Sequence, residues 1–326
     1  MRAIRCHAYG EPKAMTLDEV AEPAPEAGDL LVAVEAVGLG FVDALRIRGG
    51  YQIKNPLPFV AGSELAGKVV GVGPAVEASW IGKRVMGWGL AGALAEKAVV
   101  KAATSTLIPE LLSSEAASGF IVSYCTALYG LETCGRLQKG ETVLILGAGG
   151  GVGLAAIDVA HMLGARTIAA ASSQAKLDAA KAQGADLTVD YGGPEWRKAV
   201  QDAAGDRGID VIVDSVGGAY SETAFRCLRP GGRLLVVGFA NGEIPRIPLN
   251  LALLKRSSIV GVDWGGFRSA DLTAAGQILE RLAGDVAAAR LKPPSTSVHP
   301  LADAPKVMQS LLDRTSVGKP IIRVQA

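Results

Sequence analysis

Two patterns of hydrophobic and polar positions divide the chain. From the N-terminus to about residue 110, short apolar runs are separated by glycine and proline. Such spacing is typical of a compact, barrel-like β domain. The expected strands of this domain are residues 30–37, 65–72, 83–87 and 94–101.

Near Ser113 the pattern changes to strands that alternate with helices. The run Ser113-Ser114-Glu115 indicates a helix start, with Ser113 or Ser114 as the N-cap. The alternation that follows predicts a parallel sheet with helices on both faces. Its expected strands are residues 143–146, 167–170, 187–189, 211–214, 233–238 and 259–262, with a turn at 229–232 before the fifth strand.

The C-terminal part predicts two further helices, over 272–282 and 302–312, with a break at Pro293-Pro294 between them. A final strand is expected over 320–324 and resembles a return to the first domain. A chain of 326 residues is long enough for two domains. We therefore expect a β-rich domain formed by 1–120 and 264–326 and an α/β domain formed by 121–263.

The most informative motif is Gly147-Ala-Gly-Gly-Gly-Val-Gly153, between a buried strand at 142–146 and a helix at 154–163. Strand, glycine turn and helix form the layout that holds a dinucleotide pyrophosphate. Backbone N–H groups at the helix start point at the phosphates, and glycines let the phosphates come close. Either the run is a structural glycine turn, or, as we expect, it binds a dinucleotide through Gly150, Gly151, Val152 and Gly153.

The end of the second α/β strand predicts which dinucleotide binds. Enzymes that use NAD carry Asp or Glu about 20 residues past the glycines, whereas this chain has Ser172. Lys176 could supply positive charge to a 2′-phosphate, and Tyr191 a phenol. A hydrogen bond to a charged group contributes about 1.5–3 kcal/mol, so NADPH is favoured over NADH. The alternative for Lys176 is an ordinary solvated helix lysine.

Composition narrows the class of protein. A net charge of +1 and an aromatic content of 5% argue against a nucleic-acid surface. The sequence offers no plausible membrane span, and the N-terminus lacks an apolar signal core, so a cytoplasmic protein is expected. Cysteines and histidines are scattered, with no spacing typical of a zinc framework.

Three separate segments resemble one family. Residues 143–186 resemble the cofactor half of medium-chain dehydrogenases/reductases, and 59–74 resemble that family's signature near the active site. Residues 245–265, with the ending Ile-Val-Gly-Val-Asp-Trp-Gly, are similar to the NADPH:quinone oxidoreductase branch. The resemblance covers essentially the whole chain. It implies a Rossmann NADPH-binding domain, which is a doubly wound parallel sheet, joined to a GroES-like β-barrel catalytic domain.

The resemblance also implies chemistry without a metal. Zinc alcohol dehydrogenases of this family have a histidine where this chain has Ser63 and a cysteine at or near Phe41. Without those ligands the usual three-ligand zinc site cannot form, so alcohol oxidation is not expected. A quinone or an α,β-unsaturated carbonyl needs less assistance. The branch usually has asparagine where this chain has Gly40, and that amide is thought to position substrate.

Individual positions of the family carry over to this chain. Three residues match positions implied in catalysis: Tyr51, Thr126 and Asp43. A packing or surface tyrosine, a mid-helix threonine and a structural aspartate are their respective alternatives. The resemblance further places Gly238, Phe239, Ala240 and Trp264 beside the nicotinamide, and Lys319 near the cofactor.

Three questions about function stay open at this stage. Residues 259–262 fall at the expected sheet edge, and relatives pair that edge, so a homodimer is expected. An enoyl-thioester reductase, acting on acyl-CoA-type substrates, is the close alternative to a quinone or enone reductase. A non-catalytic NADPH-binding protein is the alternative from another class.

Overall fold

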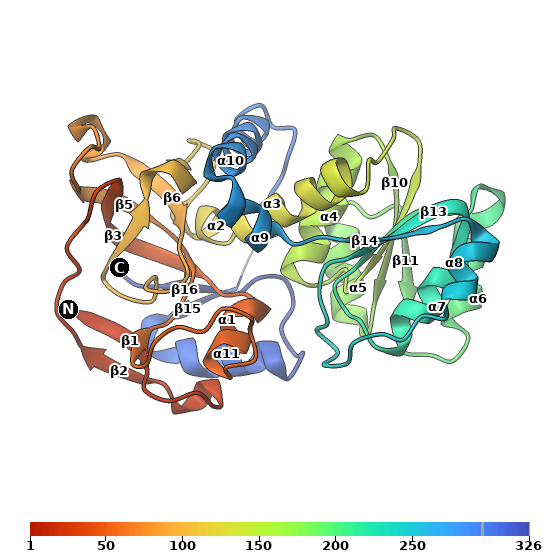
Figure 1. Ribbon diagram of the computed structural model, residues 1–326, viewed down its shortest axis with the longest axis horizontal. Coiled ribbons are helices and arrows are strands. Elements are labelled where there is room, and N and C mark those ends of the chain that lie inside the picture. Colours follow the sequence, from red (N-terminus) through yellow and green to blue (C-terminus); the bar gives the residue numbers. More distant parts are fainter. Residues whose placement is uncertain (295–296, 326) are drawn as a thin grey trace. The chain divides into compact units, whose positions relative to one another are not determined.

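The computed structural model describes residues 1–294 and 297–325 (Figure 1). Its residues fall into two compact units. Among the described residues, unit 1 comprises Met1–Val122, Ala270–Ala289 and 297–325, and unit 2 comprises Ser123–Ser269 and Arg290–Pro294. Residues 264–269 and 290–294, which we expected in the β-rich domain, thus pack with unit 2. Within the described residues, no helix is long and apolar enough to span a bilayer.

Unit 1 contains a seven-stranded sheet, in which β15-β16-β3-β5-β6-β8 follow one another and β7 also pairs with β3, and a three-stranded sheet in the order β2-β1-β4. The final strand pairs with β3, with Ile321 opposite Gly38, which confirms the expected return of the chain. The strands are β1 (Arg2–Cys6), β2 (Thr16–Glu19), β3 (Asp29–Gly38), β4 (Phe59–Val60), β5 (Glu64–Val72), β6 (Arg84–Trp88), β7 (Lys97–Lys101), β8 (Ser105–Leu107), β15 (Val298–Pro300) and β16 (Ile321–Arg323).

The alternating pattern of β3 explains the core of unit 1. Leu30, Val32 and Val34 are fully buried and belong to one apolar cluster with Ile4 and Val85. The helices of unit 1 are α1 (Phe41–Ile47), α2 (Ser114–Ser118), α10 (Leu272–Ala287) and α11 (Ala304–Leu312). The expected N-cap of α2 is confirmed, because the Ser113 hydroxyl accepts a hydrogen bond from the Ala116 N–H at 3.2 Å.

Unit 2 contains a six-stranded parallel sheet in the order β11-β10-β9-β12-β13-β14. Numbered along the chain from β9, this order is 3-2-1-4-5-6, the doubly wound arrangement that the sequence predicts. The chain reverses its direction of winding between β9 and β12, which are neighbours in the sheet. The strands are β9 (Thr142–Leu146), β10 (Arg166–Ala171), β11 (Leu187–Asp190), β12 (Ile209–Asp214), β13 (Leu228–Val236) and β14 (Ser258–Gly261).

Helices cover both faces of this sheet (Figure 1). Leu144 and Leu146 of β9 share an apolar cluster with side chains of α6, α7 and α8, so these three helices lie on one face. On the other face α4 and α5 pack against each other and against β10. The helices of unit 2 are α3 (Ile121–Leu128, which begins in unit 1), α4 (Gly151–Met162), α5 (Gln174–Ala182), α6 (Trp196–Ala204), α7 (Ala219–Cys227), α8 (Leu249–Lys255) and α9 (Trp264–Ala270, which ends in unit 1).

Two sequence predictions for unit 2 were wrong in detail. Helix α4 begins at Gly151, three residues before the expected start, because the end of the glycine run is already helical. The expected turn at 229–232 lies inside β13. Leu228 pairs with Ile209 and Arg233 pairs with Val211, so the four residues between them bulge out of the ladder.

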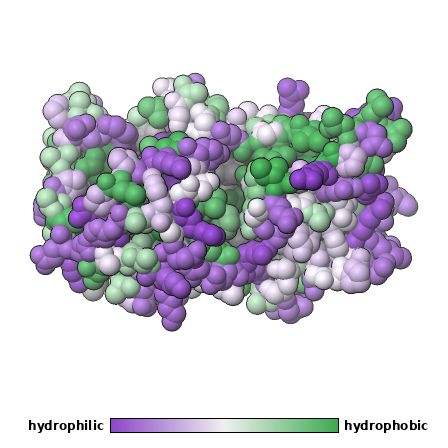
Figure 2. All heavy atoms as spheres, turned by 60° about the horizontal axis from the view of Figure 1, so that its bottom comes forward, coloured by the Kyte–Doolittle hydropathy of each residue, from purple (hydrophilic) through white to green (hydrophobic). Residues whose placement is uncertain are grey.

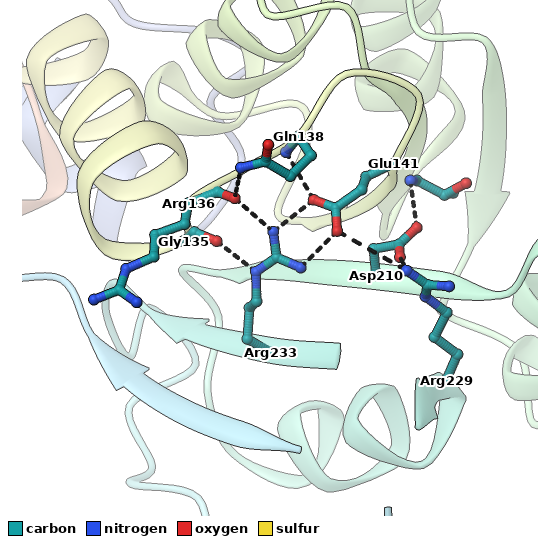
Figure 3. Close-up of polar contacts among 8 residues, drawn as sticks. Gly135, Arg136, Gln138, Glu141, Asp210, Arg229 and Arg233 are labelled. Carbon is teal, nitrogen blue, oxygen red and sulfur yellow. Dashed lines mark hydrogen bonds and ion pairs between the residues drawn. The ribbon is translucent and has the colours of Figure 1, made fainter. Parts of the chain in front are cut away.

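Ion pairs link residues at the amino edge of the unit 2 sheet, where the strands begin (Figure 3). Both Nη atoms of Arg233 contact the Glu141 carboxylate, at 2.8 and 2.5 Å, and its Nη2 also donates to the Arg136 carbonyl at 3.1 Å. Asp210 pairs with Arg229 and accepts the Thr142 N–H at 2.8 Å. These contacts join the starts of β9, β12 and β13.

Candidate cofactor and substrate sites

The glycine turn lies at the opposite, carboxyl edge of the unit 2 sheet. Gly147 follows β9 with a φ of +69°, a conformation that favours glycine. A β-carbon on Gly153 would lie 2.4 Å from the Gly147 carbonyl oxygen, so only glycine lets α4 begin this close to the turn. Gly150 is the N-cap of α4 and has no side chain to occupy the first amides of the helix. N–H groups at a helix start and the helix dipole favour the binding of an anion.

Lys176 lies directly against this turn. A β-carbon on Gly149 would meet the Lys176 Cβ at 2.4 Å and its Cγ at 2.7 Å. The aliphatic stem of the lysine therefore packs on the glycine that precedes the N-cap. Ser172, next to the end of β10, is exposed, as is Ser173, the N-cap of α5. The structure thus brings the predicted lysine, the serine and the glycine turn to one edge of the sheet.

A second loop at this edge was missed in the sequence. The buried Asp214 carboxylate accepts hydrogen bonds from the N–H groups of Val216 and Gly217, each at 2.9 Å. It also accepts from the Ser221 hydroxyl, and so it fixes the loop that follows β12. Ser215 donates to the Leu146 carbonyl at 3.2 Å, next to the glycine turn. The run Asp-Ser-Val-Gly-Gly after a strand was the available signal.

The predicted nicotinamide loop lies on the Asp214 loop. The N–H groups of Gly238 and Ala240 donate to the Asp214 and Ser215 carbonyls at 3.2 and 3.1 Å. Phe239 is 39% exposed, which is high for an aromatic side chain. The structure therefore places Gly238, Phe239 and Ala240 beside the strands where the winding reverses, where open α/β sheets bind ligands.

Other predicted residues of unit 2 are more buried. The Tyr191 ring packs against Trp196 and Tyr220, with ring centroids 6.1 and 4.7 Å away, so little of this side chain reaches the surface. Trp264 is also buried, against Tyr129. Thr126 is buried within α3.

In unit 1, three charged side chains form a buried cluster. Lys319 forms an ion pair with Glu64, and both side chains are buried. The Glu64 carboxylate also accepts the Val122 N–H at 3.0 Å. Asp43 accepts the Gly40 N–H at 2.8 Å, which caps α1. Burial lowers the pKa of Lys319 to about 8, and the Asp43 carboxylate opposes that fall.

This placement bears on two predictions. Asp43 has the structural capping role that was one of its two alternatives, and its carboxylate also faces Lys319. Lys319, predicted near the cofactor, lies inside unit 1 with its charge on Glu64. The pairing of Lys319 with Glu64 was missed, because the two positions are distant in the sequence and neither lies in a recognisable spacing.

The ring of Tyr51 packs against the buried guanidinium group of Arg46. The Arg46 guanidinium lies 4.9 Å from the centroid of the Tyr51 ring and 5.8 Å from that of Trp88. It also donates to the Leu90 carbonyl. Tyr51 itself is partly exposed. The sequence did not predict the contact between Arg46 and these two rings, because a single arginine in a helix does not indicate which aromatic residues it packs against.

The family resemblance implies that the zinc-dependent members have a histidine ligand at the position of Ser63. Ser63, at the histidine position of the zinc enzymes, is buried. Within 1–294 and 297–325, no group of three or more His, Cys, Asp or Glu side chains is arranged to hold a metal ion.

The doubly wound sheet with a glycine turn beside its winding reversal gives unit 2 the form of a dinucleotide-binding protein. Residues 26–110 match the alcohol dehydrogenase GroES-like domain, and 151–281 match the zinc-binding dehydrogenase family. A quinone oxidoreductase-like protein 2 homolog from Nematostella vectensis is 35% identical over 99% of this chain and 89% of the relative. The chain belongs to the medium-chain dehydrogenase/reductase family, in its quinone oxidoreductase branch.

Solved structures agree with this family and with both halves of the fold. A mycobacterial protein solved in complex with NADPH has a TM-score of 0.91 and 29% identity, over 99% of this chain and 100% of that one. The quinone oxidoreductase from Thermus thermophilus, whose complex with NADPH is also known, has a TM-score of 0.85 and 31% identity, over 99% and 100%. The predicted family and fold are confirmed.

Proposed function

We propose that this protein is an NADPH-dependent reductase that transfers hydride to a quinone or an α,β-unsaturated carbonyl without a metal. The observation that carries the proposal is the contact between Lys176 and the glycine turn. It puts a cationic side chain at the edge of the sheet that holds an anion site. The exposed Ser172 adds no negative charge there. NADPH, with its extra 2′-phosphate, fits this combination better than NADH.

Each predicted residue has a proposed role in binding NADPH. The amides of Gly150, Gly151, Val152 and Gly153 hold the pyrophosphate, and Lys176 holds the 2′-phosphate. Gly238, Phe239 and Ala240 lie by the nicotinamide, and Thr126 and Trp264 complete its surroundings. The ring of Tyr191 is packed against other aromatic rings, so its proposed contribution to NADPH binding is limited to its hydroxyl group. When bound, NADPH supplies the hydride.

The acceptor is proposed to lie against unit 1. Its carbonyl oxygen collects negative charge as it is reduced, and a hydrogen bond from the Tyr51 hydroxyl stabilises that charge. Asp43 positions its neighbours through the Gly40 N–H. Zinc independence is supported by Ser63, which replaces an imidazole ligand with a hydroxyl group. Metal analysis of the purified protein tests it, and one tightly bound zinc per chain would contradict it.

A panel of acceptors tests the activity. Quinones, enones and enoyl-CoA esters are offered with NADPH and, separately, with NADH, and the loss of absorbance at 340 nm is followed. We expect turnover with quinones or enones that is faster with NADPH. Turnover with the enoyl-CoA esters alone would favour the enoyl-thioester reductase. NADPH binding without turnover on any acceptor would favour a non-catalytic protein.

A homodimer is proposed through the outer edge of the unit 2 sheet. Strand β14 is an edge strand, and its Ile259 is 42% exposed. Leu249, Leu253 and Leu254 of α8 are each about three-quarters exposed, and Figure 2 shows hydrophobic surface on this unit. Such an edge favours pairing with a second copy. Light scattering should give the mass of a dimer, and a monomer at micromolar concentration would contradict the proposal.

A further inference from the structure

A cavity of about 480 Å³ opens at the surface of unit 1. Its wall combines β1 and β2 of the three-stranded sheet with β15 and β16 of the seven-stranded sheet (Figure 1). The described residues that line it all belong to this one unit, and they include none of the residues predicted for cofactor or acceptor. Cavities that hold small ligands commonly measure about 300–1,000 Å³, so the volume is sufficient for a small molecule.

Most of the cavity wall is apolar. Leu17 of β2 and Val298 of β15 are 45% and 38% exposed, whereas Leu301 and Val324 are buried. A single exposed leucine is common on a protein surface, but here apolar side chains from separate elements line one cavity. Removing their surface from water favours a ligand that has an apolar part.

Two arginines give the cavity its charge. Arg2 of β1 and Arg323 of β16 line it, and among its described lining residues there is no aspartate or glutamate. The Nε of Arg2 donates to the Glu96 carboxylate at 2.8 Å. The Nε and Nη2 of Arg323 donate to the Glu115 carboxylate at 3.3 and 3.0 Å. A guanidinium group has five N–H donors, so both arginines keep donors for a ligand.

The two ion pairs also bear on which anion fits. They hold two long side chains in place, which reduces the conformational entropy lost when a ligand binds. The carboxylates of Glu96 and Glu115 offset part of the positive charge, so a single negative charge is favoured over the double charge of a phosphate ester. The planar fork of a guanidinium group also matches a carboxylate.

We propose that this cavity binds a small carboxylate that carries an apolar chain. The carboxylate accepts hydrogen bonds from the guanidinium groups of Arg2 and Arg323. The chain packs on Leu17, Val298 and Leu301. The ligand is held by unit 1 alone, and the proposal does not depend on the reductase function, because none of these residues has a part in it.

Ligand-observed NMR titration of the whole protein tests the proposal with octanoate. Octanamide, which has the same chain length but no charge, is the matched compound. We expect saturable binding of octanoate, about tenfold tighter than that of octanamide, because only the carboxylate forms charge-assisted hydrogen bonds with both arginines. Equal affinities for the two compounds, or no saturable binding of octanoate, would overturn the proposal.

A carboxylate introduced into the wall tests the location. Leu17→Glu should weaken octanoate binding about tenfold or more, because like charges repel and apolar contact is lost. The side chain is already 45% exposed, so the variant should fold. The matched control is Leu107→Glu in β8 of the same unit, where the leucine is 51% exposed and does not line the cavity. Octanoate affinity should not change in this control.

Removal of a guanidinium group tests the charge. Arg323→Met should weaken octanoate binding about 3- to 10-fold and leave octanamide binding unchanged. The matched control is Arg48→Met, because Arg48 is also in unit 1 and also pairs with a glutamate, Glu11. The side chains of Arg323 and Arg48 are 53% and 51% exposed, so neither loss should prevent folding.

The variants separate this cavity from any other place where octanoate could bind. Unchanged octanoate affinity in Leu17→Glu and Arg323→Met would overturn the proposal, and so would equal losses in the two controls. The reductase function is judged separately, by oxidation of NADPH. A protein that binds octanoate as expected but reduces no acceptor contradicts that function alone.

Discussion

At the amino edge of the unit 2 sheet, two arginines meet two carboxylates, whereas at the carboxyl edge glycines and serines follow the same strands. Arg233 and Glu141 are 17% and 14% exposed, and their hydrogen bonds also engage loop carbonyls (Figure 3). The carboxyl edge has the opposite character, because Gly147, Gly150 and Gly153 leave backbone amides at the surface of a helix start.

The difference shows how one sheet separates stability from binding. Charged groups that satisfy one another hold the strands together but offer nothing to a ligand. Unoccupied amides and a nearby lysine add little to stability but suit a phosphorylated ligand. Substitutions at the amino edge should therefore change the free energy of unfolding, and substitutions at the carboxyl edge should change cofactor affinity.

The largest effect is expected at the amino edge. Arg233→Met leaves the Glu141 carboxylate without its main partner, and because the pair is partly buried the cost should lie between about 1 kcal/mol for an exposed pair and about 3–5 kcal/mol for a buried one. Urea denaturation should show this loss, with unchanged NADPH affinity in the folded fraction. The matched control is Arg226→Met, which breaks an ion pair with Glu222 whose side chains are 38% and 35% exposed. That change should cost less than about 1 kcal/mol, and equal losses in the two variants would count against the comparison.

The next effect is expected at Lys176. Removing its charge by Lys176→Met should weaken NADPH binding about 10- to 100-fold, because a charge-assisted hydrogen bond is lost. NADH affinity and the urea midpoint should not change. Lys181→Met, in the last turn of the same helix, is the control and should leave both affinities as they are. Fluorescence titration measures the affinity of each variant for NADPH and for NADH. An unchanged NADPH affinity in Lys176→Met would remove Lys176 from the site.

A smaller effect is expected when negative charge is added nearby. Ser172→Asp places a carboxylate next to the end of β10, where it would repel a 2′-phosphate and accept hydrogen bonds from an unphosphorylated ribose. Charge repulsion of about 1 kcal/mol predicts a fivefold to tenfold fall in the preference for NADPH over NADH. The ratio of the two dissociation constants is the readout. A ratio equal to that of wild type would mean that the 2′-phosphate lies elsewhere.

The smallest effect concerns acid stability. Burial raises the pKa of Glu141, but hydrogen bonds from Arg233 and the Gln138 N–H outweigh it, so the net pKa lies below the ordinary 4.5. The group therefore adds stability above pH 4.5, and that stability is lost as the pH falls through its folded-state pKa. In Arg233→Met this acid-dependent loss should be smaller. Thermal melts at a series of acidic pH values compare the two, and parallel curves would argue against Glu141 as the titrating group.

The fold was largely readable because local signals agreed with one another. Three buried strands of unit 2 show the pattern: Gly147 directly follows β9, Ser172 directly follows β10, and β12 ends at Asp214. The glycine run marked the turn because close approach of backbone demands glycine there. The bulge after Leu228 could not be predicted from the sequence, because a run with proline and two glycines is also typical of an ordinary turn.

The candidate site was readable only where its parts lie close together in the sequence. Lys176 follows the second strand by a few residues, so its place near the glycine turn could be anticipated. Glu64 and Lys319 meet only because β16 returns to β3, and no local pattern encodes that contact. The packing of Tyr191 against Trp196 and Tyr220 likewise depends on tertiary structure.

Hydrogen exchange on addition of NADPH tests the central claim, since mass spectrometry follows both edges of the sheet in one experiment. Peptides that cover 147–153 and 172–176 should exchange more slowly with NADPH, whereas those that cover 135–141 and 228–233 should not change. Slower exchange confined to the amino edge, or no slowing at 147–153, would contradict the account.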